Sequence, residues 1–450
     1  MSSTDASRAA VAGTHPGSSL VRAMTRWDLT ALATNGIIGA GIFGLPSSAA
    51  QMLGVSSPVA FVLCAIVVYV FVLCFAEAAG HFTETGGPYL YARTIFGPFI
   101  GFEVGWSLWL SRVSAFAANS NVLVSYLGFF IPQVTSGLAR AFVLVLVPFI
   151  LAIINVRGVS GGARFGRILA AVKVGALVLF GAAGLVFVDW SRLSGMSFSP
   201  SANWGGAILL LIYAFTGFEH AVIPAAEAKN PRKDLAWALI LALGICAAIY
   251  LAVQVVALGT VPDLATSQRP LADSARNFAG AIAGGLISLL VCVSVIGNLS
   301  ALILVSPRLT YAFSERKDFP VLFGKLHPAY GTPAASIIFF AVIGSILAIS
   351  GTFVWLVTVS VVARLANYLV TCLAVPVLRK RSVEPAQFQI PFGPVVPVTG
   401  VLLCVWLFTK AAWTDIRSFA LASGIGALLY LARPRIPLLA KQGWPRHQKK

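Results

Sequence analysis

Long apolar segments alternate with short polar loops along most of this chain. Most of these segments are long enough to cross a membrane, because a helix rises about 1.5 Å per residue and about 20 apolar residues span the hydrocarbon core of a bilayer. We predict twelve transmembrane helices, near residues 28–55, 57–80, 98–130, 140–156, 164–188, 203–226, 235–260, 277–306, 333–350, 353–378, 394–413 and 417–433. The pattern indicates an all-α polytopic membrane protein.

The composition agrees with this interpretation. Of the 450 residues, 58% are hydrophobic and only 10% are charged, which no soluble core could bury. The polar stretch 1–27 has no apolar core, so we expect a cytoplasmic N-terminal tail and no cleavable signal peptide. The six cysteines all stand singly in apolar runs and form neither a disulfide framework nor a zinc pattern. We expect no metal and no cofactor.

The net charge of +17 would suit a nucleic-acid partner, but its distribution indicates a membrane orientation signal instead. If the amino terminus is cytoplasmic, the cytoplasmic loops and tails hold 23 of the 32 Lys and Arg residues, including the basic tail 434–450. We therefore predict a multi-pass protein of the cytoplasmic membrane, embedded in the lipid bilayer with both termini cytoplasmic and with no nucleic-acid partner.

The first apolar segment is interrupted in its middle by the sequence NGIIGAGIFGLP at 35–46. Each glycine costs a helix interior roughly 1 kcal/mol relative to alanine, so this segment should break. Broken backbone at membrane depth is tolerated where protein or a water-filled cavity satisfies it, so the break indicates a polar ligand in mid-bilayer. The alternative is that these glycines only allow two helices to pack closely.

The sixth segment contains a second interruption at 215–220, FTGFEH, which mirrors the first. If the first ten helices form two five-helix repeats of opposite orientation, helices one and six correspond, and a substrate site forms where they meet. We therefore divide the chain into repeat one at 28–188, repeat two at 203–380 and two peripheral helices at 394–433.

Five stretches of the sequence match a known family. They are GIIGAGIFGLP (36–46), FTETGGPYLYARTIFGPFIGFEVGW (82–106), INVRGV (154–159), YAFTGFE with EAKNPRKDLAWAL (213–239), and SPRLTYAFSERKDFP with HPAYGTP (306–333). The chain resembles the amino acid/polyamine/organocation superfamily, which has the LeuT-type 5+5 inverted-repeat fold. One departure is that the family's pair of glutamates before KNP is here Ala226-Glu227.

This resemblance implies a site for a small zwitterionic amino acid. The amides of Gly39, Ala40 and Gly41 would lie at the positive end of a half-helix and bind the substrate carboxylate. Unpaired carbonyls near Ile38 and at 214–216 would accept hydrogen bonds from its ammonium. Tyr213 matches the position at which members of the family carry an aromatic gating residue. The predicted substrate-binding residues are Ile38, Gly39, Ala40, Gly41, Arg112, Tyr213, Ala214, Phe215 and Thr216.

The resemblance also implies proton coupling. Lys173 lies about nine residues inside the fifth span, and some proton-coupled members carry a lysine there in place of a sodium site. Such a lysine can load and release a proton during the cycle, whereas the alternative is that its side chain extends to the cytoplasmic surface. Glu219 matches a carboxylate linked to proton-dependent gating, although it could simply pair with a basic neighbour. For His220 we favour an ordinary core histidine.

The mid-membrane charges do not balance. Glu219 is the one clearly central acid, and it cannot neutralise Arg112, Lys173 and Arg364 together. Either Lys173 is neutral in the resting protein or a substrate anion supplies the missing charge. Arg112 would favour an acidic cargo, whereas internal neutralisation of Arg112 would leave a neutral one. Both interpretations exclude lysine, arginine and polyamines as preferred substrates.

Two other classes remain to be weighed. The sequence GVSGG at 158–162 fits GxSxG and, with His220, suggests an intramembrane serine protease, but it lies in a predicted loop without the strand-turn-helix context of a nucleophile elbow. No other enzyme motif is present, so we expect no enzyme. A channel is the second class, which the paired interruptions disfavour. We predict an amino acid permease, either a proton symporter or an exchanger, and leave its oligomeric state open.

Overall fold

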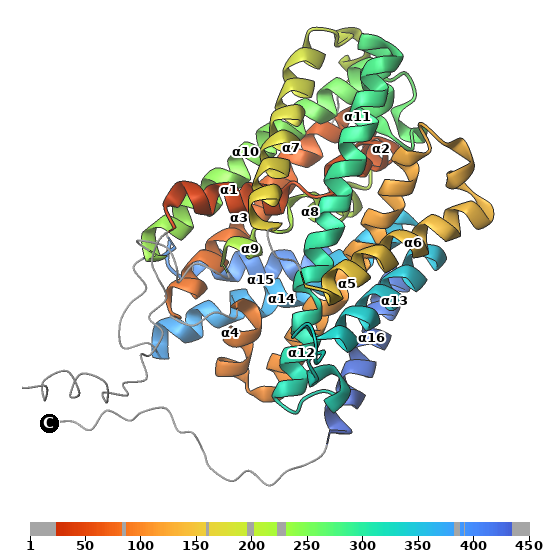
Figure 1. Cartoon of the computed structure of the whole chain (residues 1–450). Coiled ribbons are helices and arrows are strands. Elements are labelled where there is room, and N and C mark those ends of the chain that lie inside the picture. The colour runs from red at the N-terminus through yellow and green to blue at the C-terminus, as the bar shows by residue number, and fades with distance from the viewer. Residues whose placement is uncertain are drawn as a thin grey trace, which may run out of the picture.

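The computed structural model describes residues 24–82, 87–158, 162–195, 202–222, 231–381, 388–390 and 392–433. These residues form α-helices, short 3₁₀ turns and loops, and most of the helices pack side by side in one bundle (Figure 1). The prediction of an all-helical protein is therefore confirmed for the described part of the chain.

Every predicted apolar run contains a helix or an interrupted pair of helices. The continuous ones are α3 (Ser57–Gly80), α5 (Pro98–Leu127), α6 (Gly137–Val156), α7 (Gly162–Leu185), α10 (Pro231–Thr260), α11 (Pro270–Val305), α13 (Ala334–Ser350), α14 (Phe353–Arg381), α15 (Val395–Phe408) and α16 (Trp413–Leu431). Helix α11 begins earlier than predicted and kinks at Gly280, whose φ is 83°. A kink there separates the amphipathic first turns from the spanning part.

The two runs predicted to break are both interrupted. The first is divided into α1 (Arg26–Ile37) and α2 (Gly41–Leu53), and the second into α8 (Trp204–Phe215) and α9 (Glu219–Val222). The start of α1 is fixed by a capping box, in which Thr25 and Asp28 each accept a hydrogen bond from the backbone N–H of the other. Helix α8 ends at Phe215, and Gly217 with a φ of 107° turns the chain into α9.

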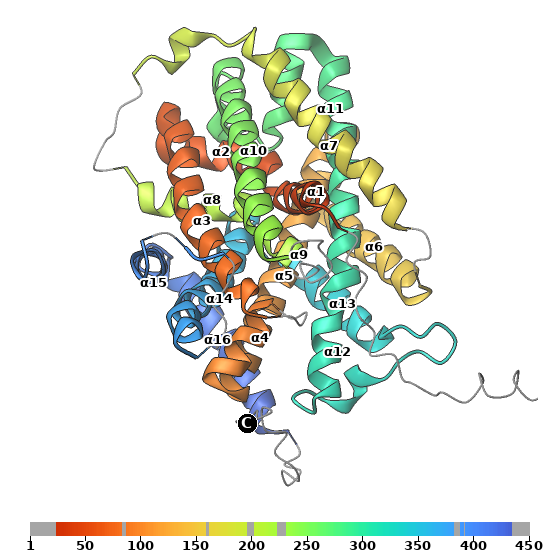
Figure 2. The same ribbon diagram turned by 90° about the vertical axis from the view of Figure 1, so that its left-hand side faces the viewer.

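Two helices were not predicted as separate elements. Helix α4 (Gly87–Phe96) follows α3, and α12 (Pro307–Glu315) follows α11. Both lie at the end of the bundle where the last residues of α16 are found (Figure 2). They are short and more polar than the spanning helices, so hydrophobic length alone does not reveal them.

Several helical segments are long and apolar enough to cross a membrane. Among the described residues these are Gly41–Gly80, Gly137–Val156, Asp234–Thr260, Pro270–Glu315 and Phe353–Lys380. The pair α15–α16, bent by 110°, is a sixth candidate. The interrupted helices and the 17-residue α13 fall short of a single uninterrupted span, so the predicted total of twelve stays a prediction.

The outer face of the bundle is apolar. Leu138, Val186 and Ile282 are 80–90% exposed, although such side chains avoid water. Polar groups are buried instead, with Ser111 and Thr371 fully enclosed. This inside-out distribution suits a protein surrounded by lipid, and it places the polar chemistry in the centre of the bundle.

Candidate substrate site

The two helix interruptions touch each other in the middle of the bundle. A Cβ atom on Gly217 would lie 2.2 Å from the carbonyl oxygen of Gly36, and one on Gly41 would lie 2.9 Å from Cα of Ala214. Neither distance is possible for a real side chain, so both glycines allow backbone to approach backbone. Gly41 therefore also has the packing role that the sequence offered as an alternative.

The first interruption leaves unbonded amides at the start of α2. Gly39 was predicted to offer its amide, but in this conformation its N–H donates to the carbonyl of Ile37 at 2.7 Å. The amides of Ala40 and Gly41 have no backbone partner among the described residues. They lie at the positive end of the 13-residue helix α2, which favours a negatively charged group.

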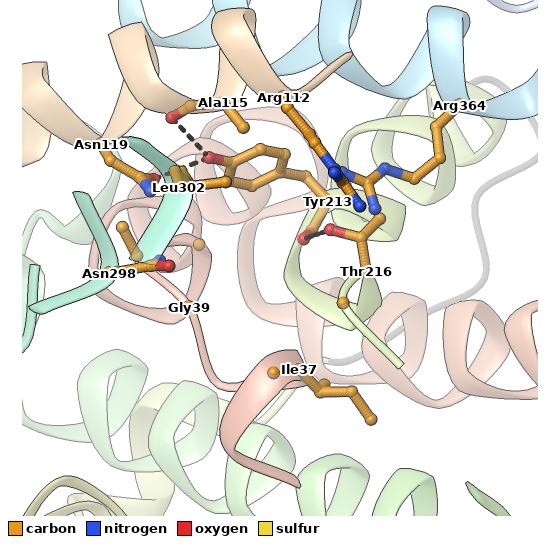
Figure 3. Close-up of a pocket in the computed structure, with 14 residues that line it drawn as sticks. Ile37, Gly39, Arg112, Ala115, Asn119, Tyr213, Thr216, Asn298, Leu302 and Arg364 are labelled. Atoms are coloured by element: carbon orange, nitrogen blue, oxygen red, sulfur yellow. Dashed lines mark hydrogen bonds between the residues drawn. The ribbon is translucent and has the colours of Figure 1, made fainter. Parts of the chain in front are cut away.

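A small pocket with several polar groups in its lining lies against both interruptions (Figure 3). Its volume is about 40 Å³, which leaves room only for a small molecule. It is lined by Gly36, Ile37, Gly39, Ala40, Gly41, Arg112, Ala115, Asn119, Tyr213, Thr216, Gly217, Asn298, Leu302 and Arg364. The pocket thus lies where the repeat argument predicts a substrate.

Six of the nine predicted substrate-binding residues line this pocket, namely Gly39, Ala40, Gly41, Arg112, Tyr213 and Thr216. Ile38, Ala214 and Phe215 do not. Two of the carbonyls expected to be unpaired have neighbouring donors. Lys173 donates to Ile38, and the Tyr250 hydroxyl lies 3.0 Å from the carbonyl oxygens of both Ala214 and Ile37, which share its one proton. Substrate binding by any of the nine stays a prediction.

Tyr213 closes one side of the pocket. Its hydroxyl donates to Oδ1 of Asn119 at 2.7 Å and lies 3.3 Å from the carbonyl oxygen of Ala115, while Thr216 Oγ1 donates to the Tyr213 carbonyl at 2.8 Å (Figure 3). These bonds hold the aromatic ring between α5 and the second interruption. Its predicted gating role remains a prediction.

Lys173 lies behind the first interruption. Its residue is 8% exposed, and its Nζ donates to the carbonyl oxygen of Asn35 at 3.2 Å and to that of Ile38. Asn35 lies in the last turn of α1 and Ile38 is the residue after it, so no later turn of helix uses either carbonyl. The lysine of α7 therefore takes the place of missing backbone donors, and the alternative that it extends to the membrane surface is wrong.

Glu219 accepts hydrogen bonds from three donors among the described residues. Its Oε1 accepts from Nη1 of Arg364 at 3.1 Å and from the Tyr368 hydroxyl at 2.8 Å, and its Oε2 accepts from the Gly217 amide at 2.8 Å. The ion pair is buried, with side chains 8–9% exposed. The pairing with a basic neighbour is therefore observed, and it joins the second interruption to α14, while the predicted gating role stays a prediction.

Arg112 differs from Arg364. It is only 5% exposed and lines the pocket, yet it forms no hydrogen bond or ion pair with any described residue. Figure 3 shows the Arg112 and Arg364 guanidinium groups lying close together at one side of the pocket. Burying a charged guanidinium without a partner costs free energy, so an anion that binds Arg112 would be favoured.

Some predicted features lie outside the described residues. They are the middle of the GVSGG motif at 159–161, the pair Ala226-Glu227 and the side chain of His220. No group of three or more potential metal ligands occurs among the described residues.

Sequence reasoning missed several lining residues. Ala115 and Asn119 follow Arg112 at helical spacings of three and seven residues, so the face of α5 that carries Arg112 could have revealed them. Asn298 and Leu302 share a face of α11, and a lone asparagine inside an apolar span was the available signal. Which helix face turns toward the pocket depends on packing, which the sequence pattern does not specify.

Comparison with known proteins identifies the family. A family model described as amino acid permease matches residues 24–426. The chain is 29% identical to the methylthioribose transporter of Bacillus subtilis (93% of this chain, 94% of the relative) and 27% identical to the branched-chain amino acid permease BcaP of the same species (94% and 96%). It is 28% identical to the serine/threonine exchanger SteT of Bacillus subtilis (87% and 91%). The chain therefore belongs to the amino acid permease family, whose members are multi-pass membrane transporters and not enzymes.

Proposed function

We propose that this chain is a secondary active amino acid transporter that works by alternating access. The observation that carries the proposal is the meeting of two interrupted helices around one polar pocket, with Gly217 packed against the Gly36 carbonyl. In this proposal repeats 28–188 and 203–380 form a LeuT-type fold with ten of twelve spans, and the peripheral helices lie at 394–433. The substrate lies at mid-membrane between the repeats.

The α-carboxylate of the substrate binds the amides of Ala40 and Gly41. These two N–H groups lie at the positive end of α2, and no described backbone group competes for them. Thr216 and Asn298 line the same pocket and supply oxygen acceptors for the ammonium. These contacts recognise the α-carboxylate and the ammonium, which all amino acids share. Other residues of the pocket must therefore recognise the substrate side chain.

Transport is coupled to protons through Lys173. The charged ammonium donates hydrogen bonds to two carbonyls at the end of α1. A neutral lysine has only two N–H donors, and the lone pair on its nitrogen repels carbonyl oxygens. Loading and losing a proton therefore changes how firmly α7 holds the interrupted end of α1. Glu219 acts in gating because its three donors connect the second interruption to α14.

The orientation follows from the basic loops. Both termini face the cytoplasm, and the chain resides in the cell membrane. Exchange of one amino acid for another is the second candidate function, because the serine/threonine relative is named an exchanger. The three relatives cited carry three different substrate names, so the cargo of this chain must be argued from its own pocket.

Transport by purified protein in proteoliposomes tests the proposal. Vesicles preloaded with an amino acid mixture should take up a labelled member of the set by saturable counterflow, which a pore does not perform. An inward proton gradient without sodium should drive net accumulation in empty vesicles if the protein is a symporter. Uptake that needs internal amino acid and ignores the gradient would favour exchange, and failure of counterflow with every amino acid would reject the proposal.

A further inference from the structure

Two arginines converge on the pocket from neighbouring helices, but only one of them has an acidic partner. Arg364 on α14 donates to Glu219 at 3.1 Å through Nη1 and to Ser111 Oγ at 3.1 Å through Nε. Arg112 on α5 lies beside it (Figure 3) and has no such partner among the described residues. The side chain is nevertheless held at 5% exposure.

Glu219 is poorly placed to serve both arginines. Its two oxygens already accept hydrogen bonds from Arg364, Tyr368 and the Gly217 amide. Arg112 is close enough to feel the charges of Glu219 and Arg364, but those two charges oppose each other. The described lining of the pocket contains two guanidinium groups and no carboxylate. Because Glu219 pairs with Arg364, the positive charge left uncompensated at the pocket is that of Arg112.

We propose that the substrate is an amino acid with an acidic side chain, and that Arg112 binds its distal carboxylate. This inference rests on the proposed transport function. The α-carboxylate binds the α2 amides, so the second carboxylate is the group left for Arg112. A guanidinium pairs with a carboxylate through two parallel hydrogen bonds, which also fixes the orientation of the substrate.

The same arrangement explains what the pocket rejects. A cationic side chain would lie against the guanidinium of Arg112, which has no acidic partner among the described residues. A neutral amide of the same shape would accept hydrogen bonds from Arg112 but would leave its charge uncompensated. Removing one partner of a buried charged pair is costly, so the acid should bind far better than its amide.

Isosteric substrate pairs test the charge directly. Inhibition of counterflow would be measured with aspartate against asparagine and glutamate against glutamine, with alanine as a substrate lacking a side-chain polar group. In wild type, at least one of the two acids should inhibit at a concentration at least tenfold lower than its amide. Lysine should inhibit less than alanine.

Variants assign this preference to Arg112. Arg112→Gln should abolish the tenfold acid preference while alanine still inhibits, and Arg112→Lys should keep a reduced preference because the charge remains but the two-bond geometry is lost. Arg192→Gln is the matched control, since Arg192 is a partly exposed arginine in the loop after α7, paired with Asp189. Arg192→Gln should show the same counterflow rate and the same acid preference as wild type. Size-exclusion chromatography would show that the variants are folded.

Three outcomes would overturn the inference and leave the transport function standing. The first is counterflow of neutral amino acids in wild type with no preference for either acid. The second is an acid preference that survives in Arg112→Gln. The third is an equal loss of acid, amide and alanine binding in that variant, which would assign Arg112 to the α-carboxylate. Absence of counterflow with all amino acids would instead reject the transport function itself.

Discussion

The ammonium of Lys173 lies 3.2 Å from the carbonyl oxygen of Asn35, so a single side chain of α7 supports the interrupted end of α1. The same Nζ also donates to Ile38, one residue beyond the helix. In an uninterrupted helix both carbonyls would accept backbone N–H groups four residues later. The bond therefore connects a titratable side chain to the interrupted end of the first helix.

Replacing Lys173 should uncouple transport from the proton gradient. Lys173→Met removes the ammonium but keeps much of the apolar volume, so accumulation driven by an inward proton gradient should fall at least tenfold while counterflow persists. Lys325→Met is the control, because Lys325 is an exposed lysine in the loop after α12. Gradient-driven accumulation at the wild-type level in Lys173→Met would remove this residue from coupling.

Glu219 should be more important for stability than Tyr368, one of its donors. Glu219→Gln leaves Arg364 charged and buried, which costs about 3–5 kcal/mol, whereas Tyr368→Phe removes one hydrogen bond to a charged group at a cost of about 1.5–3 kcal/mol. Thermal unfolding in detergent should therefore rank the variants wild type, Tyr368→Phe, Glu219→Gln in decreasing order. The reverse order of the two variants would contradict a charge-paired Glu219.

A double variant measures the pairing itself. Glu219→Gln combined with Arg364→Gln removes both buried charges, so it should lose less stability than the sum of the two single variants. Additive losses would mean that the 3.1 Å contact contributes no coupling energy.

The sequence predicts the two interruptions because glycine is unfavourable inside a helix, and Gly39 and Gly217 are visible in the chain without any structure. It does not predict what meets them. That Gly217 packs on Gly36, or that Tyr250 donates to Ala214, follows from how α1, α8 and α10 pack in three dimensions. Hydrophobic pattern reports the length of a helix but not its neighbours.

Charge placement shows the same division. Counting residues identifies Arg112, Lys173 and Arg364 as an excess of central cations over Glu219. Only the structure assigns the carboxylate to Arg364 and the frayed carbonyls to Lys173, because helix rotation decides which side chains come within hydrogen-bond distance. Arg112 is then the cation left over.

A second buried acid, Glu77, which does not line the pocket, should stabilise the contact between the ends of α3 and α14. Glu77 is fully buried, and Arg379 donates to its two oxygens at 2.5 and 2.7 Å while the Ile390 amide donates at 2.8 Å. Arg379→Met would leave that carboxylate without its counter-charge, so we expect a loss of about 3–5 kcal/mol in thermal unfolding experiments. Substrate competition by folded protein should be unchanged.

The neighbouring Lys380 provides the comparison for that variant. Its residue is exposed, and it forms no ion pair with any described residue, so Lys380→Met should unfold as wild type does. Equal unfolding temperatures for Arg379→Met and Lys380→Met would show that the Glu77 contact adds nothing to stability.

Gly217 should tolerate no side chain, for two independent reasons. Its φ of 107° is a conformation that L-residues with a Cβ rarely adopt, and its Cβ would lie 2.2 Å from the Gly36 carbonyl oxygen. Gly217→Ala must therefore push α1 and α9 apart or change the turn between α8 and α9. We expect a lower unfolding temperature and at least a tenfold loss of counterflow. Gly244→Ala is the matched control, because Gly244 lies inside α10 and a Cβ added there would have no neighbouring atom within 4 Å. Alanine at this position should leave transport unchanged and stabilise the helix by roughly 0.5–1 kcal/mol. If both variants transported like wild type, the close contact of the two interruptions would not be required for function.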